Sequence, residues 1–219
     1  MDRIELLSAM ADEIRVCQLC RLADTRTHAV PGEGNPQASI MFVGEGPGEQ
    51  EDQSGRPFVG RSGKLLTQEM VKIGIRREQI FITNIVKCRP PGNRDPLGDE
   101  IVACNDWLSA QIALIDPKFI VPVGGPSLKT LVSPKLGIMK ARSKVYRKDG
   151  ILFIPILHPA AALRSPNTMQ QFLEDLTNLK DYLNREIEDA EITPIEEPRP
   201  IAPPPIANYE EDGGTLSLF

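Results

Sequence analysis

Four cysteines are the residues whose types and spacing most directly suggest chemistry in this chain. Cys17 and Cys20 form a Cys-x-x-Cys pair, and Cys88 and Cys104 follow at a distance. A close pair with two distant partners is enough to surround one metal ion or one iron–sulfur cluster, and no cysteine is left over. In a reducing compartment this pattern favours a metal site over disulfides, and it leaves zinc and a cluster as open alternatives.

Four other side chains combine useful chemistry with an unusual sequence context. Glu45 lies in a glycine-rich turn, as either a solvated turn residue or a carboxylate directed into a cleft. Phe58, between proline and other turn-forming residues, either fills the core or offers a stacking surface to a flat ring. Asn84 lies inside an apolar run, so its amide needs a neighbouring loop or the edge of a nucleobase as partner. His158, which Pro159 follows, is either a structural cap or a group that stabilises charge on a departing molecule.

Four short apolar runs predict the strands that position these residues. The runs span residues 39–44, 80–86, 118–124 and 151–157, and they lack polar–apolar alternation, which is typical of strands buried on both faces. Helical patterns cover residues 2–16, 62–73, 99–115, 127–132 and 168–185. This order predicts the α/β class: a three-layer α/β/α sandwich around a four-stranded, mainly parallel sheet. Active sites of such sheets lie at the carboxyl ends of the strands, so we expect the turns after the four runs to converge.

The charge of the chain is unevenly distributed. Residues 186–219 hold nine acidic side chains and one basic one, whereas residues 1–185 hold 24 basic and 21 acidic ones, a net charge of +3. The body can therefore accept phosphates although the whole chain carries −5. We predict a domain over residues 1–185 and an acidic, proline-rich, disordered tail over residues 186–219. Without a signal-peptide pattern or an apolar run near ~20 residues, we expect a cytoplasmic protein that does not enter a membrane.

Several segments together resemble one protein family, the family 4 uracil-DNA glycosylases. The motifs that carry the resemblance are residues 44–49, 55–60, 83–91 and 158–164, and the likeness covers about residues 4–183. The four cysteines also match that family. The resemblance implies a 4Fe–4S cluster on Cys17, Cys20, Cys88 and Cys104. It also implies that the protein hydrolyses the N-glycosidic bond of uracil in DNA and leaves an abasic site for base excision repair.

The resemblance also implies roles for the residues around the uracil. Phe58 would stack on the flipped base, and Asn84 would read its O4 and N3 edge. His158 would contact O2 and stabilise the developing uracil anion. Glu45 would orient or activate the water, and the backbone of residues 46–47 (Gly46 and Pro47) would line the same pocket. An amide that pairs with O4 and N3–H discriminates against cytosine, in which both groups are reversed.

Contacts with DNA are expected from two further segments. Leu163 and Arg164 would enter the minor groove and fill the gap that the flipped base leaves in the stack. Lys87 and Arg89 flank Cys88, and we expect the metal site to orient both of them toward the DNA. The expected species is a monomer associated with the nucleoid.

The chain ends in a short apolar segment on a polar tether. Residues 215–219, from Thr215 to Phe219, are similar to the pentapeptide that binds the bacterial sliding clamp, although threonine stands where glutamine is usual. The alternative is an incidental apolar terminus. As a clamp ligand, this segment would let a bacterial repair enzyme travel with the replication machinery.

Two other functions compete with the enzyme. One is a zinc- or cluster-stabilised domain that binds nucleic acid without chemistry, and the other is a redox or electron-transfer protein. The presence of Glu45, Asn84 and His158 together argues against the first. The second would need only the cysteines and would leave the strand-end motifs unexplained.

Overall fold

A six-stranded sheet forms the centre of the protein in the computed structural model, which describes residues 2–195. Its strand order is β1-β3-β2-β4-β6-β5, and the inner strands β3, β2, β4 and β6 run parallel. The strands are β1 (Glu33–Gly34), β2 (Ile40–Gly44), β3 (Phe81–Asn84), β4 (Phe119–Pro122), β5 (Tyr146–Lys148) and β6 (Ile151–Phe153). The four parallel strands confirm the predicted runs. The two antiparallel edge strands were missed because they are short and carry no apolar run.

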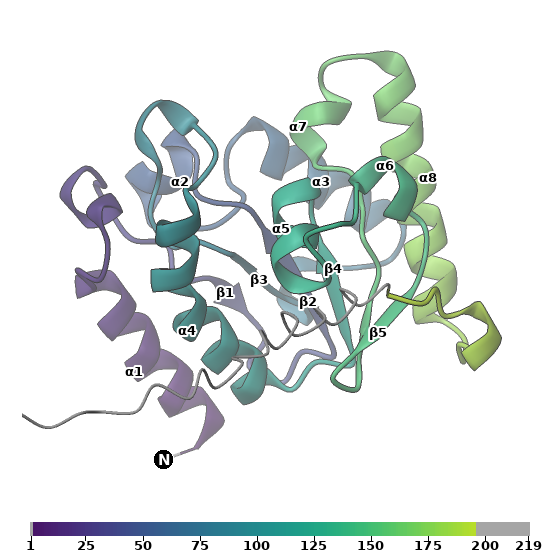
Figure 1. Ribbon diagram of the computed structural model, residues 1–219, viewed down its shortest axis with the longest axis horizontal. Coiled ribbons are helices and arrows are strands. Elements are labelled where there is room, and N and C mark those ends of the chain that lie inside the picture. Colours follow the sequence, from purple (N-terminus) through teal and green to yellow (C-terminus); the bar gives the residue numbers. More distant parts are fainter. Residues whose placement is uncertain (1, 196–219) are drawn as a thin grey trace, which may run out of the picture.

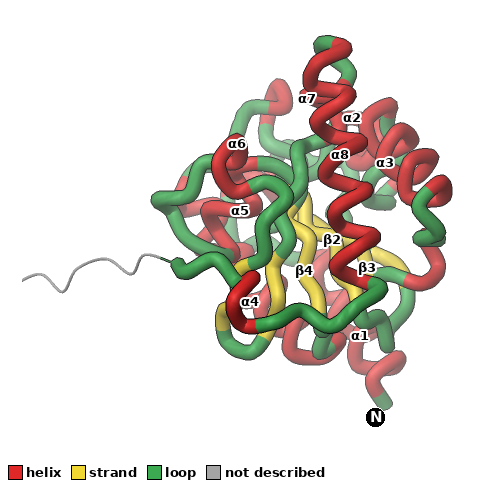
Figure 2. The backbone as a smooth tube through the Cα atoms, turned by 90° about the vertical axis from the view of Figure 1, so that its right-hand side faces the viewer, coloured by secondary structure: helices red, strands yellow, loops and turns green. Residues whose placement is uncertain are grey.

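Helices cover both faces of this sheet, as the predicted three-layer sandwich requires (Figure 1). They are α1 (Arg3–Val16), α2 (Glu49–Ser54), α3 (Arg61–Lys72), α4 (Gly98–Ile115), α5 (Gly125–Leu131), α6 (Ile138–Ala141), α7 (Pro159–Ala162) and α8 (Pro166–Leu183). Figure 2 shows α8 lying across the sheet on the same side as α3. Phe42 of β2 packs with the core of α3 and α8, whereas its neighbours Met41 and Val43 pack with that of α4 and α5. This alternation is the reason that the run had to be apolar throughout.

The N-terminal helix places the first two cysteines beside segments from the middle of the chain. A capping box of Asp2 and Glu5 starts α1, which then packs along α4. The helix ends at Val16, so Cys17 and Cys20 enter an irregular segment beside a small core of Ile14, Leu22 and Val86. The predicted helices over residues 2–16, 62–73, 99–115, 127–132 and 168–185 are all confirmed.

The chain remains attached to the body beyond the predicted domain boundary at residue 185. The amide of Thr193 donates to the carbonyl of Val145 at 2.7 Å, and Ile192 forms a parallel bridge with the same residue. Asp189 pairs with Arg147 at 2.6 Å. The acidic composition concealed these anchors, so the prediction of disorder is wrong for residues 186–195. Residues 196–219, including the apolar terminus, lie outside the described residues. Within residues 2–195, each helix is either too short or too polar to span a membrane.

Candidate functional site

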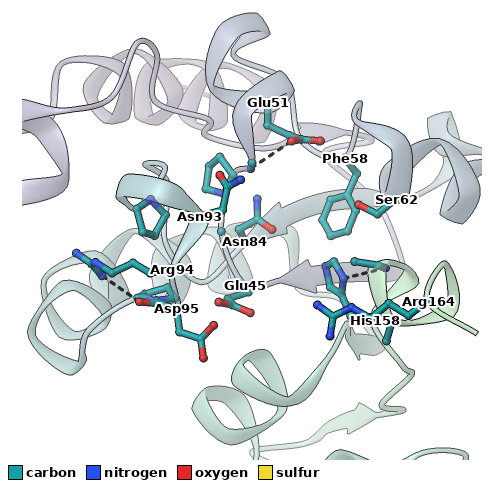
Figure 3. Close-up of a pocket in the computed structure, with 17 residues that line it drawn as sticks. Glu45, Glu51, Phe58, Ser62, Asn84, Asn93, Arg94, Asp95, His158 and Arg164 are labelled. Atoms are coloured by element: carbon teal, nitrogen blue, oxygen red, sulfur yellow. Dashed lines mark hydrogen bonds between the residues drawn. The ribbon is translucent and has the colours of Figure 1, made fainter. Parts of the chain in front are cut away.

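A pocket of about 580 Å³ opens at the carboxyl ends of the parallel strands (Figure 3). All six residues expected to surround the base line it, and they come from turns far apart in the sequence. These residues are Glu45, Gly46, Pro47, Phe58, Asn84 and His158. The predicted convergence of the strand-end turns is therefore confirmed, whereas the role of each residue remains a prediction. Arg164 lines the same pocket, and Leu163 lies in the groove beside it.

Phe58 forms one wall of the pocket in an uncommon backbone conformation. Its φ angle is 53°, in the left-handed region that non-glycine residues seldom adopt. Its ring lies so close to Gly44 that a Cβ atom there would come within 2.5 Å of both the ring and the Oδ1 atom of Asn84. A Cβ at Gly63 would meet the Phe58 backbone at 2.1 Å. Glycines at these two positions therefore let β2 and α3 pack against the aromatic wall.

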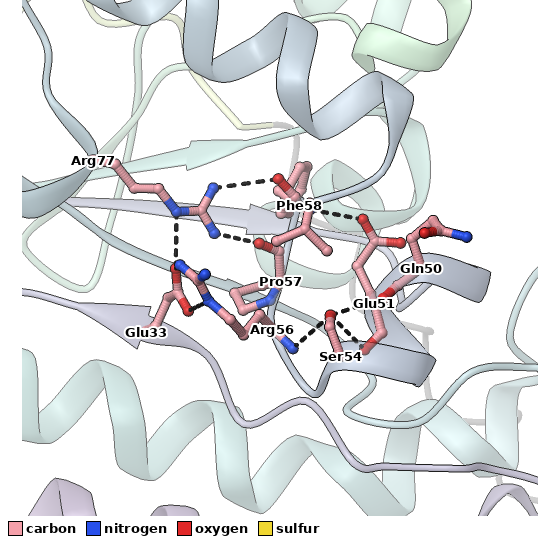
Figure 4. A network of polar contacts seen from close by, with 9 residues as sticks. Glu33, Gln50, Glu51, Ser54, Arg56, Pro57, Phe58 and Arg77 are labelled. Carbon is pink, nitrogen blue, oxygen red and sulfur yellow. Dashed lines mark hydrogen bonds and ion pairs between the residues drawn. The ribbon is translucent and has the colours of Figure 1, made fainter.

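Two charged side chains, Glu51 of the pocket and Arg77 outside it, hold the Phe58 segment (Figure 4). The Glu51 carboxylate accepts hydrogen bonds from the amides of Val59 and Gly60, at 2.9 and 2.7 Å. On the other side, the Arg77 guanidinium donates to the Phe58 carbonyl at 3.3 Å and also to the carbonyl of Pro57. These hydrogen bonds hold the strained segment in place from two sides. Strained residues that are held in this way are often found at functional sites.

Glu33 of β1 completes this support. Its carboxylate accepts hydrogen bonds from Arg77 at 2.9 Å and from Arg56 at 2.8 Å. Burial raises the pKa of Glu33, but the hydrogen bonds and charges of the two arginines outweigh it and hold the pKa below its ordinary value. The carboxylate therefore stays ionised near neutral pH and fixes the direction of the Arg77 fork.

Asn84 is the last residue of β3 and pairs in register with Gly44 of β2. It is only 2% exposed, yet its side-chain amide has no hydrogen-bond partner among the described residues. The residue lines the pocket, so water or a ligand there can pair with its amide. The amide can therefore offer a donor and an acceptor to an occupant of the pocket, and its role in reading a base remains a prediction.

His158 lies at the start of α7, opposite Asn84. Its Nδ1 atom accepts a hydrogen bond from the Ala160 amide at 3.2 Å, so the proton of the neutral ring is on Nε2. Burial lowers the pKa of His158 to about 4; Glu51 opposes this shift and Arg164 adds to it. The imidazole is thus neutral at physiological pH, and it can donate the Nε2–H group into the pocket. Its ring centroid is 6.2 Å from that of Phe58.

Glu45 has the acid–base character that the sequence could only suggest. Burial, followed by the nearby carboxylate of Asp95, raises the pKa of Glu45 to about 7. The amide of Val86 donates to the Glu45 carbonyl at 3.1 Å, which fixes the turn on the neighbouring strand. A carboxylate with a pKa near neutrality is suited to take a proton from water.

The sequence did not identify several pocket residues, notably Glu51, Asn93 and Asp95. Asn93 has a φ angle of 55° and accepts a hydrogen bond from Arg89 at 2.7 Å. Residues 91–97 contain the turn formers proline, glycine and asparagine, and they resemble an ordinary connection between a strand and a helix. The only available signal was this concentration of turn residues directly after a motif, since loops carry function more often than composition reveals.

Lys87 does not lie on the DNA face, and that prediction is wrong. The side chain is 1% exposed. Its ammonium group donates to Thr83 Oγ1 at 2.7 Å, to the Asn84 carbonyl at 2.9 Å and to Gln111 Oε1 at 2.7 Å. Three oxygens satisfy the buried donor, and burial lowers its pKa to about 8. The chain after β3 turns inward at this residue, whereas Arg89 remains partly exposed.

All four cysteines line one small cavity, as the spacing predicted. Three groups donate hydrogen bonds to the sulfurs: Arg26 to Cys88 at 3.1 Å, Trp107 to Cys17 at 3.4 Å and the Lys87 amide to Cys104 at 3.3 Å. Such donors suit thiolates that hold a cluster. Within residues 2–195, no three His, Cys, Asp or Glu side chains converge closely enough for a single ion. Four cysteine thiols are the ligands that an iron–sulfur cluster needs, so this donor set fits one.

Comparison with known proteins gives a consistent result. A family model described as the Uracil DNA glycosylase superfamily matches residues 31–180, which include every residue of the pocket. A type-4 uracil-DNA glycosylase of Sulfurisphaera tokodaii is 49% identical over 188 residues, which cover 81% of this chain and 85% of that protein. One from Thermotoga maritima is 44% identical, with 84% of this chain and 98% of that protein covered. A type-5 enzyme of Thermus thermophilus is 30% identical over 119 residues, 48% of this chain and 54% of its own length.

Proposed function

The chain belongs to the uracil-DNA glycosylase superfamily and groups with its type-4 members, and from this membership we propose how its residues remove uracil from DNA. The reaction hydrolyses the N-glycosidic bond and leaves an abasic site. The observation that carries the residue assignments is the convergence, in one pocket, of an unpartnered amide, a neutral imidazole donor and a carboxylate of raised pKa. A binding module without chemistry would need neither the imidazole donor nor the carboxylate of raised pKa.

Recognition depends on the Phe58 wall and on Asn84. A base inside the duplex cannot be attacked, so the uracil must leave the stack at a cost of a few kcal/mol. Stacking on Phe58 contributes about 1–3 kcal/mol toward that cost. The Asn84 amide donates to O4 and accepts from N3–H, and cytosine reverses both groups. Cytosine would therefore leave two buried polar groups unpaired, which costs several kcal/mol.

Bond cleavage depends on His158 and Glu45. As the bond between C1′ and N1 breaks, its electron pair passes to the uracil, and the Nε2–H of His158 donates to O2, where negative charge develops. A neutral donor suffices because the charge is spread over the ring. Water attacks C1′ and gives its proton to the Glu45 carboxylate, which also stabilises the cationic sugar. The uracil anion takes up one proton from solvent and Glu45 returns its proton to solvent, so uracil and the abasic sugar are the products and no further reactant is needed.

The cysteine site is proposed to hold a 4Fe–4S cluster through Cys17, Cys20, Cys88 and Cys104. When bound, the cluster supplies a covalent link between distant segments of the chain rather than a step of the reaction. Cys17, at the end of α1, and Cys20, just beyond it, would then be fixed relative to Cys104 of α4. The remaining ligand, Cys88, lies in the segment that begins directly after Asn84.

Contacts with DNA outside the pocket are assigned to Leu163, Arg164 and Arg89. Leu163 is 36% exposed at the end of α7, which suits a wedge that replaces the flipped base in the stack. Arg164 lines both the pocket and the adjoining groove, where it can meet a phosphate. The protein is proposed to act as a monomer on nucleoid DNA.

The terminal segment of residues 215–219, which is outside the described residues, is proposed to bind a bacterial sliding clamp. Deletion of residues 214–219 is expected to abolish binding to purified clamp and to leave uracil release unchanged. Unchanged clamp affinity in the truncated protein would refute this proposal without touching the glycosylase assignment.

The function is tested by incubating freshly purified, cluster-loaded protein with a duplex that holds one U:G pair, followed by alkali. Strand cleavage at the uracil is expected, with no cleavage of the matched C:G duplex. Absence of cleavage would overturn the enzyme assignment. The same preparation is expected to be brown, with broad absorbance near ~400 nm. A colourless protein with one zinc per chain would overturn the cluster and leave the glycosylase test intact.

A further inference from the structure

A buried carboxylate lies behind the His158 wall of the pocket. Asp175 is in the middle of α8 and is 0% exposed. Its Oδ2 atom accepts a hydrogen bond from the Leu157 amide at 2.8 Å. Its Oδ1 atom accepts one from the Ser143 hydroxyl at 2.7 Å and lies 2.8 Å from Nε of Arg142. One side chain of α8 therefore binds the backbone directly before His158.

The sheet cannot provide this contact. The amides of Ile154 and Ile156 donate to the carbonyls of Ile120 and Pro122 in β4, each at 3.0 Å. The amide of Leu157 has Asp175 as its acceptor instead, so the chain leaves the sheet under the control of α8. An ionised group in an apolar helix layer costs several kcal/mol unless each oxygen is paired, and a hydrophobic residue would fill the space at lower cost.

The opposite side of His158 is fixed just as closely. The amide of Gly124 donates to the Ile156 carbonyl at 3.0 Å, and a Cβ atom at Gly124 would come within 3.1 Å of the His158 side chain. The backbone that carries the imidazole is thus held between the turn after β4 and the carboxylate on α8. A displacement of this backbone would move Nε2 away from the atom on which charge develops.

We propose that Asp175 is a positioning residue for the reaction: through the Leu157 amide it fixes the direction in which His158 donates to the departing base. The inference rests on the proposed role of His158. Donors aimed at developing charge lose much of their effect when they are displaced by a fraction of an ångström to an ångström. Asp175 therefore affects stabilisation of the leaving group, rather than binding of the base by Phe58 and Asn84.

The test compares two leaving groups under single-turnover conditions. Fluorine at C5 makes uracil a better leaving group, so a 5-fluorouracil substrate depends less on the donor. We expect Asp175→Asn to slow release of uracil about 10-fold or more, and release of 5-fluorouracil by no more than about 3-fold. His158→Ala is expected to show the same bias more strongly. The variant that carries both substitutions should be no slower than His158→Ala alone, because both substitutions act on the same interaction, the hydrogen bond from His158 to the departing base.

Leu179→Ala is the matched control, since Leu179 is a fully buried residue of the same helix without a polar contact to the His158 backbone. It should lower the melting temperature without any bias between the substrates. If Asp175→Asn does not fold, Ser143→Ala removes one hydrogen bond to Asp175 and should give the same bias at smaller size.

The outcomes separate the inference from the function on which it rests. Equal slowing of both substrates by folded Asp175→Asn, or an additive double variant, would overturn the positioning role while His158→Ala still shows the bias. Absence of the bias in His158→Ala would overturn the role of His158 and the inference with it. A wild-type protein that does not release uracil would overturn the proposed function as well.

Discussion

The Phe58 wall and the His158 wall of the pocket are held by different means. Phe58 is in a strained conformation, and the charged side chains of Glu51 and Arg77 form hydrogen bonds with the backbone of Phe58 and its neighbours. His158 has ordinary dihedral angles, and a fully buried carboxylate of another helix, Asp175, binds the backbone before it. A stacking ring needs a wall of the right shape, whereas a hydrogen-bond donor needs a direction. The first wall should therefore govern binding and the second the rate of bond cleavage.

The largest effects are expected from His158 and Asn84, the two side chains proposed to form hydrogen bonds with the base. His158→Ala and Asn84→Ala should each reduce activity by at least ~100-fold while the fold survives, since each removes a directed polar contact to the reacting base. For His158→Ala the loss should appear in the single-turnover rate at saturation. For Asn84→Ala, discrimination between uracil and cytosine should weaken as well. A near-normal rate in either folded variant would contradict its assigned role and the contrast between the walls.

Gly44 lies against both the Phe58 ring and the Asn84 side chain, so its substitution should disturb binding of the base. Gly44→Ala places a Cβ atom 2.5 Å from the Phe58 ring and from Asn84 Oδ1, and one of them must move. We expect about a 10- to 100-fold loss in kcat/KM, mainly through KM. Gly98→Ala is the control, because nothing lies within 4 Å of its Cβ position. Full activity of Gly44→Ala would show that the wall yields without cost.

Sequence reasoning anticipated the features that depend on local pattern. Continuous apolar runs identified the four parallel strands because both faces of each must be buried. The carboxyl ends of those strands then brought Glu45, Asn84 and His158 together without any knowledge of contacts between them. The position of a residue at the end of a strand was therefore enough to predict most of the site.

The features that sequence reasoning missed depend on packing between distant segments. Lys87 carries a charge that is normally exposed, and only the combination of three oxygens around it explains its burial. Asp175 has the same character: in sequence it is one acid among others on an amphipathic helix. The anchoring of residues 186–195 was missed because the segment is mostly acidic. Its isoleucines Ile187 and Ile192 nevertheless pack against the core, a contact that the composition does not reveal. Such partnerships have no periodicity to detect.

Arg77 offers a milder way to test the Phe58 wall, because within residues 2–195 its side chain forms hydrogen bonds only with Glu33 and with the carbonyls of Pro57 and Phe58. Arg77→Met should raise KM about 3- to 10-fold with little change in the saturated rate, since it loosens the shape of the wall and leaves His158 in place. The ratio of uracil to 5-fluorouracil release should stay as in the wild type. Arg76→Met, at an exposed neighbouring position, should change neither quantity. A shifted ratio in Arg77→Met would show that the two walls are coupled.

The smallest effect is expected from Asp95, which lies near Glu45 in the pocket; the pKa of Glu45 is about 7. If the Glu45 carboxylate accepts the proton of water, activity should rise as the pH passes upward through about 7. Asp95 contributes to that raised pKa, because its negative charge favours the protonated form of Glu45. Asp95→Asn should therefore lower the pKa of Glu45 and shift the rising limb of the pH–rate profile to lower pH, with the plateau rate unchanged. Glu45→Gln should lose this limb altogether. A limb that stays in place in Asp95→Asn would mean that burial alone sets the pKa of Glu45, and that the loop of residues 91–97 shapes the pocket without tuning its base.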